Sequence, residues 1–138
     1  MTDIQKLIQK EKDFIEKAPP TDVDVELGGD ILTIGVRPLI GSDWVAVCMQ
    51  VPPRSGVTLD AALGFNVEAV ARRYKPERLT VNGAEFEYDD DWTELYDALA
   101  SPHRKNIATA MWGVNVYDPE QRLIARLKER DAAKEDQS

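Results

Sequence analysis

Two helical patterns joined by a Ser-Pro pair constrain the fold of this chain most strongly. They lie in residues 89–117, DDDWTELYDALASPHRKNIATAMWGVNVY. Four apolar residues in the first half recur at the i, i+3, i+4, i+7 spacing of one helix face: Trp92, Leu95, Tyr96 and Leu99. A second apolar stripe follows, with Ile107, Met111 and Val114. Because the connection is short, these patterns predict an antiparallel helix pair on which the rest of the chain packs.

Polar residues predict where these two helices begin. Asp91 is the expected N-cap of the first helix, and Glu94 three residues on completes a capping box. Ser101 is the expected N-cap of the second helix, which puts Pro102 at the first helical position, where an N–H has no partner in the helix. The acids at 89–91 also suggest a Mg²⁺ or Ca²⁺ cluster, but we favour capping, because calcium loops space their ligands around a glycine.

Residues 3–17 predict an amphipathic helix with a narrow apolar stripe. The stripe consists of Ile4, Leu7, Ile8, Phe14 and Ile15, among Lys, Gln and Glu. Two interpretations stay open, because such a stripe can pack on the chain's own core or dock on another subunit or partner. The prolines at 19–20 end the helix and form a short, stiff connector.

The strongest strand pattern lies in residues 21–39, TDVDVELGGDILTIGVRPL. Apolar residues alternate with acids before Gly28-Gly29-Asp30, and apolar residues alternate again after it. The glycines supply the positive φ angles of a tight hairpin. In residues 79–88, Asn82-Gly83 predicts a second hairpin, with an irregular loop as the alternative.

Shorter apolar segments predict further helices. Residues 44–50 predict a buried helix capped by Ser42 or Asp43, with a strand as the alternative because apolar residues also alternate there. Asn66 is expected to start another helix, with Val67, Val70, Ala71 and Tyr74 on one face.

A last helix is expected to begin at Asp118, which caps it. Pro119 then takes the first helical position and Gln121 completes a capping box. Its only strong apolar residues are Leu123, Ile124 and Leu127.

Together these elements predict an α+β fold in which an N-terminal helix and a β-hairpin pack on a mainly helical domain. We expect one domain over residues 1–138. The amphipathic helix and linker occupy residues 1–20, the core occupies residues 21–130, and a mobile acidic tail occupies residues 131–138.

Composition excludes several classes of partner. The chain has 138 residues and a net charge of -8, which argues against binding nucleic acid through its phosphates. No apolar run approaches the roughly 20 residues of a membrane helix, and the N-terminus lacks the apolar core of a secretory signal. We therefore expect no nucleic acid partner, no membrane partner and a cytoplasmic location.

The sequence marks no catalytic or metal-binding constellation, so we expect neither an enzyme nor a cofactor. His103 is the only histidine, which excludes a metal site built on several imidazoles, and it is expected to be solvated. Cys48 is expected to be a small core residue rather than a reactive thiol. The basic groups at 72–75 and 103–105 are expected to be solvated helix faces. Three tryptophans are expected to anchor the core, with one at most facing a partner: Trp44, Trp92 and Trp112.

Five motifs follow one another from about residue 23 to residue 117. They are DVDVELGGDILTIGVRPL, SDWVAVCMQVPPR, GFNVEAVARRY, DDDWTELYDAL and SPHRKNIATAMWGVNVY. This order resembles the tail assembly chaperones of long-tailed bacteriophages, of the kind found in phages of Gram-positive hosts. In that family a β segment precedes a Trp-containing helix, a Pro-Pro-Arg loop, a Phe-Asn segment with its helix, an acid-rich turn, a Trp-x-x-Leu helix and an arginine-containing corner.

The resemblance implies a non-enzymatic role in tail assembly. Such chaperones bind the long, helical, aggregation-prone tape measure protein before tail tube subunits polymerise around it, and they leave the finished virion. Many are made in two forms by programmed ribosomal frameshifting, so the polar end AAKEDQS would be the point where an extension joins. The implied location is the host cytoplasm, and the implied partners are the tape measure protein, the tail tube protein and further copies of the chain.

We expect the N-terminal stripe to be the contact surface, through Ile4, Leu7, Ile8, Phe14 and Ile15. Two alternative functions stay open. One is a structural head or tail component of a phage. The other is an acidic DNA-mimic inhibitor, which would need carboxylates spaced along one face like phosphates.

Overall fold

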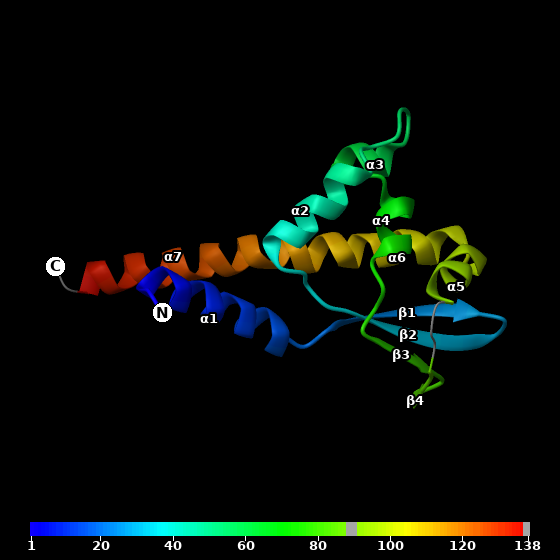
Figure 1. Ribbon diagram of the computed structural model, residues 1–138, viewed down its shortest axis with the longest axis horizontal. Coiled ribbons are helices and arrows are strands. Elements are labelled where there is room, and N and C mark those ends of the chain that lie inside the picture. Colours follow the sequence, from blue (N-terminus) through cyan, green and yellow to red (C-terminus); the bar gives the residue numbers. More distant parts are fainter. Residues whose placement is uncertain (88–90, 137–138) are drawn as a thin grey trace.

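The computed structural model describes residues 1–87 and 91–136. It has the α+β architecture that the sequence predicts, with a four-stranded antiparallel sheet in the order β1-β2-β3-β4 and a mainly helical remainder (Figure 1). The elements in chain order are α1 (Asp3–Lys17), β1 (Thr21–Leu27), β2 (Asp30–Val36), α2 (Gly41–Gln50), α3 (Thr58–Leu63), α4 (Val67–Arg73), β3 (Arg78–Val81), β4 (Ala84–Glu85), α5 (Trp92–Ala98), α6 (Ser101–Trp112), the π-helical segment η1 (Gly113–Tyr117) and α7 (Asp118–Asp136).

The first hairpin confirms the alternating pattern. β1 and β2 pair from Thr21 opposite Val36 to Leu27 opposite Asp30. The two glycines between the strands take φ angles of 61° and 88°, the left-handed values that a two-residue hairpin turn requires. The inner face of β2 is buried, and Ile31 beside the turn is exposed, because alternate side chains point to opposite faces.

The second hairpin also forms, so the irregular-loop alternative is wrong. Asn82 and Gly83 take φ angles of 51° and 85° and join β3 to β4. Asn82 ties this turn to the first hairpin. Its side-chain amide donates to an oxygen of Asp30 at 3.0 Å, and its side-chain oxygen accepts from the backbone N–H of Ile31 at 3.0 Å. Tyr88, at the end of the predicted hairpin, lies outside the described residues.

One continuous apolar core lies between the sheet and the helices. α6 packs on β1 and β2, and α4 packs on α6 (Figure 1). Ile34 of the sheet and Ile107 and Met111 of α6 are fully buried where these layers meet. Asn66 caps α4 as predicted, accepting from the N–H of Ala69 at 3.1 Å, and the predicted face of α4 is buried.

The predicted antiparallel pair is not the central packing unit, because α5 packs mainly on α4. The indole N–H of Trp92 donates to the carbonyl of Ala71 at 2.8 Å. The side-chain caps predicted for these two helices do not form, since among the described residues no side chain caps α5 or α6. Asp91 is the N-cap residue of α5 as predicted, but it takes helical angles and makes no capping bond. Ala100, not Ser101, is the N-cap residue of α6. Asp89 and Asp90 lie outside the described residues.

Residues 41–50 form helix α2, so the strand alternative is wrong. Ile40 is the N-cap residue, and neither Ser42 nor Asp43 caps the helix. The predicted burial is also wrong, since Trp44 is the only buried residue among the ten of α2, all of them described. The reason is that α2 rises away from the sheet and packs on α4 along one side (Figure 1).

The last helix, α7, begins at Asp118 as predicted, but this is not a free helix start, because α6, η1 and α7 follow one another as one continuous helical rod. Pro119 has no N–H for the carbonyl of Asn115, and its ring would collide with a normal helical turn there. The chain widens instead, so that the Asp118 N–H donates to the carbonyl of Gly113, five residues back. The tail predicted from residue 131 is helical up to Asp136, since it is rich in good helix formers.

Ile34 and Ile31 lie on opposite faces of β2 and give a matched test of the fold. Ile34 is fully buried, so Ile34→Ala should lower the free energy of unfolding by about 2–5 kcal/mol through loss of apolar contact and a residual cavity. Ile31 is 57% exposed, so Ile31→Ala should change it by less than about 0.5 kcal/mol. Urea unfolding followed by tryptophan fluorescence measures both, and equal effects would contradict the faces assigned to β2.

Candidate partner-binding surface

The N-terminal helix stays outside the core. None of the 15 residues of α1, all of which the structure describes, is buried. Within the stripe the exposed fractions are 70% for Ile4, 66% for Leu7, 50% for Ile8 and 49% for Phe14, and Ile15 is half-buried. The interpretation that this stripe closes the chain's own core is therefore wrong.

α1 is stabilised locally by a capping box that the sequence analysis missed. The Gln5 N–H donates to the Thr2 hydroxyl at 3.2 Å, and the Gln5 side chain accepts from the Thr2 N–H at 2.9 Å. The Thr-x-x-Gln pattern could have revealed it. The helix is thus held by its own cap while its apolar stripe remains in water.

α7 runs beside α1 in the opposite direction (Figure 1). Arg122 joins them, since its guanidinium lies 4.2 Å from the ring centroid of Phe14 and 3.7 Å from a carboxylate oxygen of Glu11. α7 adds apolar residues that are 58%, 38% and 36% exposed: Leu123, Ile124 and Leu127. The sequence marked these three residues, but no local pattern indicated that they would lie near the N-terminal stripe.

A groove runs between the two helices, and we call it the α1–α7 groove. It consists of two adjoining hollows of about 480 and 420 Å³ that share Glu11, Phe14, Pro119 and Arg122. The first hollow reaches the loop residue Leu39 and η1, and the second is lined by Leu7 and Leu123. A lining that combines apolar and charged residues suits one face of an amphipathic helix.

Only the C-terminal half of α1 is tied to the body by hydrogen bonds or ion pairs among the described residues. The guanidinium of Arg37 donates to the carbonyl of Glu16 and also pairs with Glu77. Glu11 and Phe14 make the contacts with Arg122 described above. The exposed residues Ile4, Leu7 and Ile8 therefore lie on the more weakly attached half of the helix.

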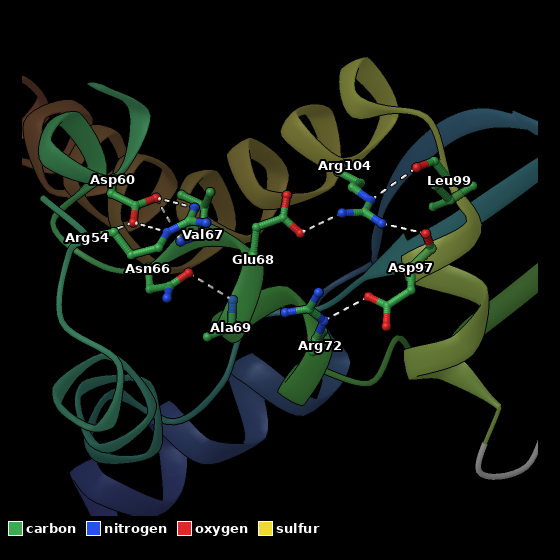
Figure 2. Close-up of polar contacts among 10 residues, drawn as sticks. All are labelled: Arg54, Asp60, Asn66, Val67, Glu68, Ala69, Arg72, Asp97, Leu99 and Arg104. Carbon is green, nitrogen blue, oxygen red and sulfur yellow. Dashed lines mark hydrogen bonds and ion pairs between the residues drawn. The ribbon is translucent and has the colours of Figure 1, made fainter. Parts of the chain in front are cut away.

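The most buried charge of the described residues lies in the body of the domain (Figure 2). Asp60 of α3 is fully buried and accepts four hydrogen bonds. Three come from Arg54, through its backbone N–H at 2.9 Å and its guanidinium at 2.8 and 3.0 Å, and one comes from the Val67 N–H at 3.2 Å. Arg54, by its hydrogen bonds, lowers the pKa of Asp60 to about 2.

The Arg54–Asp60 pair joins the Pro-Pro-Arg loop to the start of α4. Both oxygens of Asp60 are occupied by donors, so this carboxylate is arranged to hold structure rather than to accept a proton from a substrate. The sequence analysis noted Arg54 only as part of a motif and missed Asp60, since nothing local marks a single aspartate as buried.

A second ionic cluster joins α4, α5 and α6 (Figure 2). Arg104 pairs with Glu68 at 3.1 Å, donates to the carbonyls of Asp97 and Leu99, and lies 5.3 Å from the centroid of the Tyr96 ring. Arg72 pairs with Asp97 at 2.8 Å. Arg104 is half-buried, so the prediction that the group at 103–105 is a solvated face is wrong for Arg104, whereas Arg72 is exposed as predicted. The two arginines together hold the corner between α5 and α6.

The remaining candidate residues take packing positions. Trp44 and Trp92 are buried as predicted, and Trp112 is half-buried. Cys48 is half-buried, and its burial raises the pKa of the thiol, which favours the unreactive protonated form. His103 is half-buried and not fully solvated.

Within residues 1–87 and 91–136, no group of three His, Cys, Asp or Glu side chains could hold a metal ion. The helices of this part include none that is both long enough and apolar enough to cross a membrane. Comparison with protein-family models, curated proteins and solved structures gives no match to this chain.

Asp60 should make stability depend on pH in acid. Its pKa of about 2 in the folded state lies below the value of roughly 3.9 for an unfolded aspartate, so the unfolded chain takes up the proton first as pH falls. The contribution is complete above about pH 5 and is lost between about pH 4 and pH 2, a change of about 2 kcal/mol in the free energy of unfolding.

Urea unfolding at several pH values measures this contribution. Asp60→Asn should lower stability at neutral pH and flatten the acid profile, whereas Asp43→Asn, at an exposed position, should keep the parental profile. Parallel profiles for the parent and Asp60→Asn would contradict the assigned role.

Proposed function

We propose that this protein is a non-enzymatic phage tail assembly chaperone that binds and solubilises the tape measure protein. The observation that carries the proposal is the apolar stripe of α1, which lies in water beside the exposed apolar residues of α7. The order of motifs from about residue 23 to residue 117 supplies the family resemblance. A chaperone for a helical partner needs such an open apolar surface on a well-packed body.

The α1–α7 groove supports a helix-in-groove mode of binding. An amphipathic partner helix would place its apolar face against Leu7, Phe14 and Leu123, and each large side chain that is fully buried contributes about 1.5–3 kcal/mol. The lining of the groove carries both signs of charge, with Lys10 and Glu11 on α1 and Arg126 on α7. The partner's charges would then fix its orientation in the groove.

The net charge of -8 supports the solubilising role. The chaperone would cover the apolar stripes of its partner, and complexes that carry this negative charge would repel one another. Both effects oppose aggregation. We place this work in the host cytoplasm, before tail tube subunits polymerise, and we propose that the protein leaves the finished virion. A longer form made by ribosomal frameshifting would extend from the polar C-terminal end of α7.

Co-expression with the tape measure protein tests the surface. Leu7→Asp with Ile8→Asp should reduce co-purification of the tape measure protein at least tenfold, because two charges would enter an apolar contact. The domain should keep its melting temperature, since neither residue is buried. Met49→Asp is the matched control, because Met49 is an exposed apolar residue (78%) on α2, away from the groove. Unchanged co-purification of the double variant would remove this surface from the account.

The coding sequence offers a separate test of the family assignment. A slippery heptamer near the stop codon, an overlapping reading frame and a very long helical gene downstream are expected. Absence of all three would contradict the tail assembly role, whatever the groove binds.

A further inference from the structure

β1 is an outer strand of the sheet. In the described part of the chain it pairs with β2 along its seven residues and with no strand on its other side. An outer strand of this length presents a row of backbone N–H and C=O groups to whatever lies beside it. Which residues present them follows from the register.

The hydrogen bonds of β2 fix the direction of these groups. The carbonyl of Ile31 accepts from the Asn82 N–H at 2.8 Å, and the carbonyl of Gly35 accepts from the Glu77 N–H at 3.3 Å. The backbone N–H and C=O groups of the odd-numbered residues of β2 thus point away from β1, and those of the even-numbered residues point toward it. Val25 lies opposite Leu32, so the backbone groups of the odd-numbered residues of β1 point toward β2. The backbone groups of Asp22, Asp24 and Glu26 therefore point outward from the sheet.

The same three residues carry exposed carboxylates on the outer face of the sheet. Asp24 accepts from the Thr33 hydroxyl at 2.6 Å and Glu26 accepts from the Gly29 N–H at 3.1 Å. Both donors are neutral, and none of the three carboxylates forms an ion pair within the described residues. The row therefore keeps its negative charge. On the opposite face of β1, Val23 is half-buried and Val25 is buried.

We propose that the outer edge of β1 accepts an extended segment of a basic partner by strand addition. Residues of that segment opposite Asp22, Asp24 and Glu26 would exchange backbone hydrogen bonds with them and place their side chains on the same face. Lys or Arg at these alternate positions forms cross-strand ion pairs. The residues between them lie on the face of Val23 and Val25, so they are apolar.

The three carboxylates of β1 determine which kind of segment can bind at this edge. Two copies of this edge would set like charges opposite one another, which opposes self-pairing. A segment in which basic and apolar residues alternate meets both the backbone groups and the carboxylates. This inference does not depend on the tape measure protein, because the edge and the α1–α7 groove consist of different residues.

Peptide binding to the full-length protein tests the proposal. The probe is a fluorescent, end-blocked peptide, Thr-Lys-Val-Lys-Val-Lys-Thr, titrated by fluorescence anisotropy. Binding should become at least tenfold weaker for a scrambled peptide of the same composition. It should weaken equally for a peptide whose lysine residues carry a methyl group on the backbone nitrogen, because this peptide keeps its charge but cannot donate backbone hydrogen bonds to the strand. A peptide with Glu in place of Lys should not bind.

Charge-matched variants separate the edge from general acidity. Asp22→Asn with Asp24→Asn and Glu26→Gln should weaken the lysine peptide at least tenfold and reduce the salt dependence of binding. The control removes the same number of charges from exposed residues of α7, with Glu120→Gln, Glu129→Gln and Asp131→Asn. It should bind within about twofold of the parent.

Amide hydrogen exchange followed by NMR reports on the backbone directly. In the protein alone the amides of Asp22, Asp24 and Glu26 should exchange rapidly, and the lysine peptide should slow them at least tenfold. The proposal is overturned if the three amides stay rapid at saturating peptide, or if the scrambled and N-methylated peptides bind as well as the probe. Either result would mean that the carboxylates only prevent self-pairing of the edge.

Discussion

The burial of one face of α6 between the sheet and α4 determines the rest of the structure. Ile107 and Met111 are fully buried there, and the rod that contains them continues through η1 into α7. The core ends near Val114, but the helix does not. α7 therefore projects past the core with apolar residues that remain partly exposed. The exposed surface next to α1 follows from this mismatch between the length of the helix and the size of the core.

Asn115 and Pro119 set the point where the core face of the rod ends. The Asn115 side chain donates to the Met111 carbonyl at 2.8 Å and to the Tyr74 hydroxyl at 3.0 Å, and it accepts from the Leu39 N–H at 2.9 Å. These bonds attach η1 to α4 and to the loop before α2. Beyond the wide turn that Pro119 requires, Arg122 attaches α7 to α1. The rod thus has a fixed half and a half that is available to a partner.

Sequence patterns of a few residues correctly predicted the turns and caps whose interactions are local. Both hairpins follow from glycine and asparagine at left-handed positions, and Asn66 caps α4 as expected. The first turns of α5 and α6 were predicted less well, because the side chains expected to cap them make no capping hydrogen bonds. Arg104 instead donates to carbonyls at the end of α5, an interaction that no capping rule includes. The helix expected to begin at Asp118 continues the rod instead of standing alone, because a π turn accommodates Pro119 inside a helix.

Burial was the property that sequence predicted least well. The stripes of α1 and α2 look the same as stripes that pack on a core, and only the positions of the sheet and α4 decide that they stay outside. The Arg54–Asp60 pair was missed because no short motif links Asp60 to its donors, which lie six residues before it and seven residues after it and converge only when the loops around α3 fold. The candidate stripe residues could therefore be named from sequence, but their exposure, and the contribution of α7, required the structure.

The central claim is that the stripe of α1 and the exposed apolar residues of α7 lie in water until a helical partner covers them. Hydrogen-exchange mass spectrometry of the protein alone and in complex with the tape measure protein tests it most directly. Exchange should slow in residues 3–17 and 119–127 and should stay unchanged in α2. No change in the first two segments, or protection confined to α2, would contradict the account.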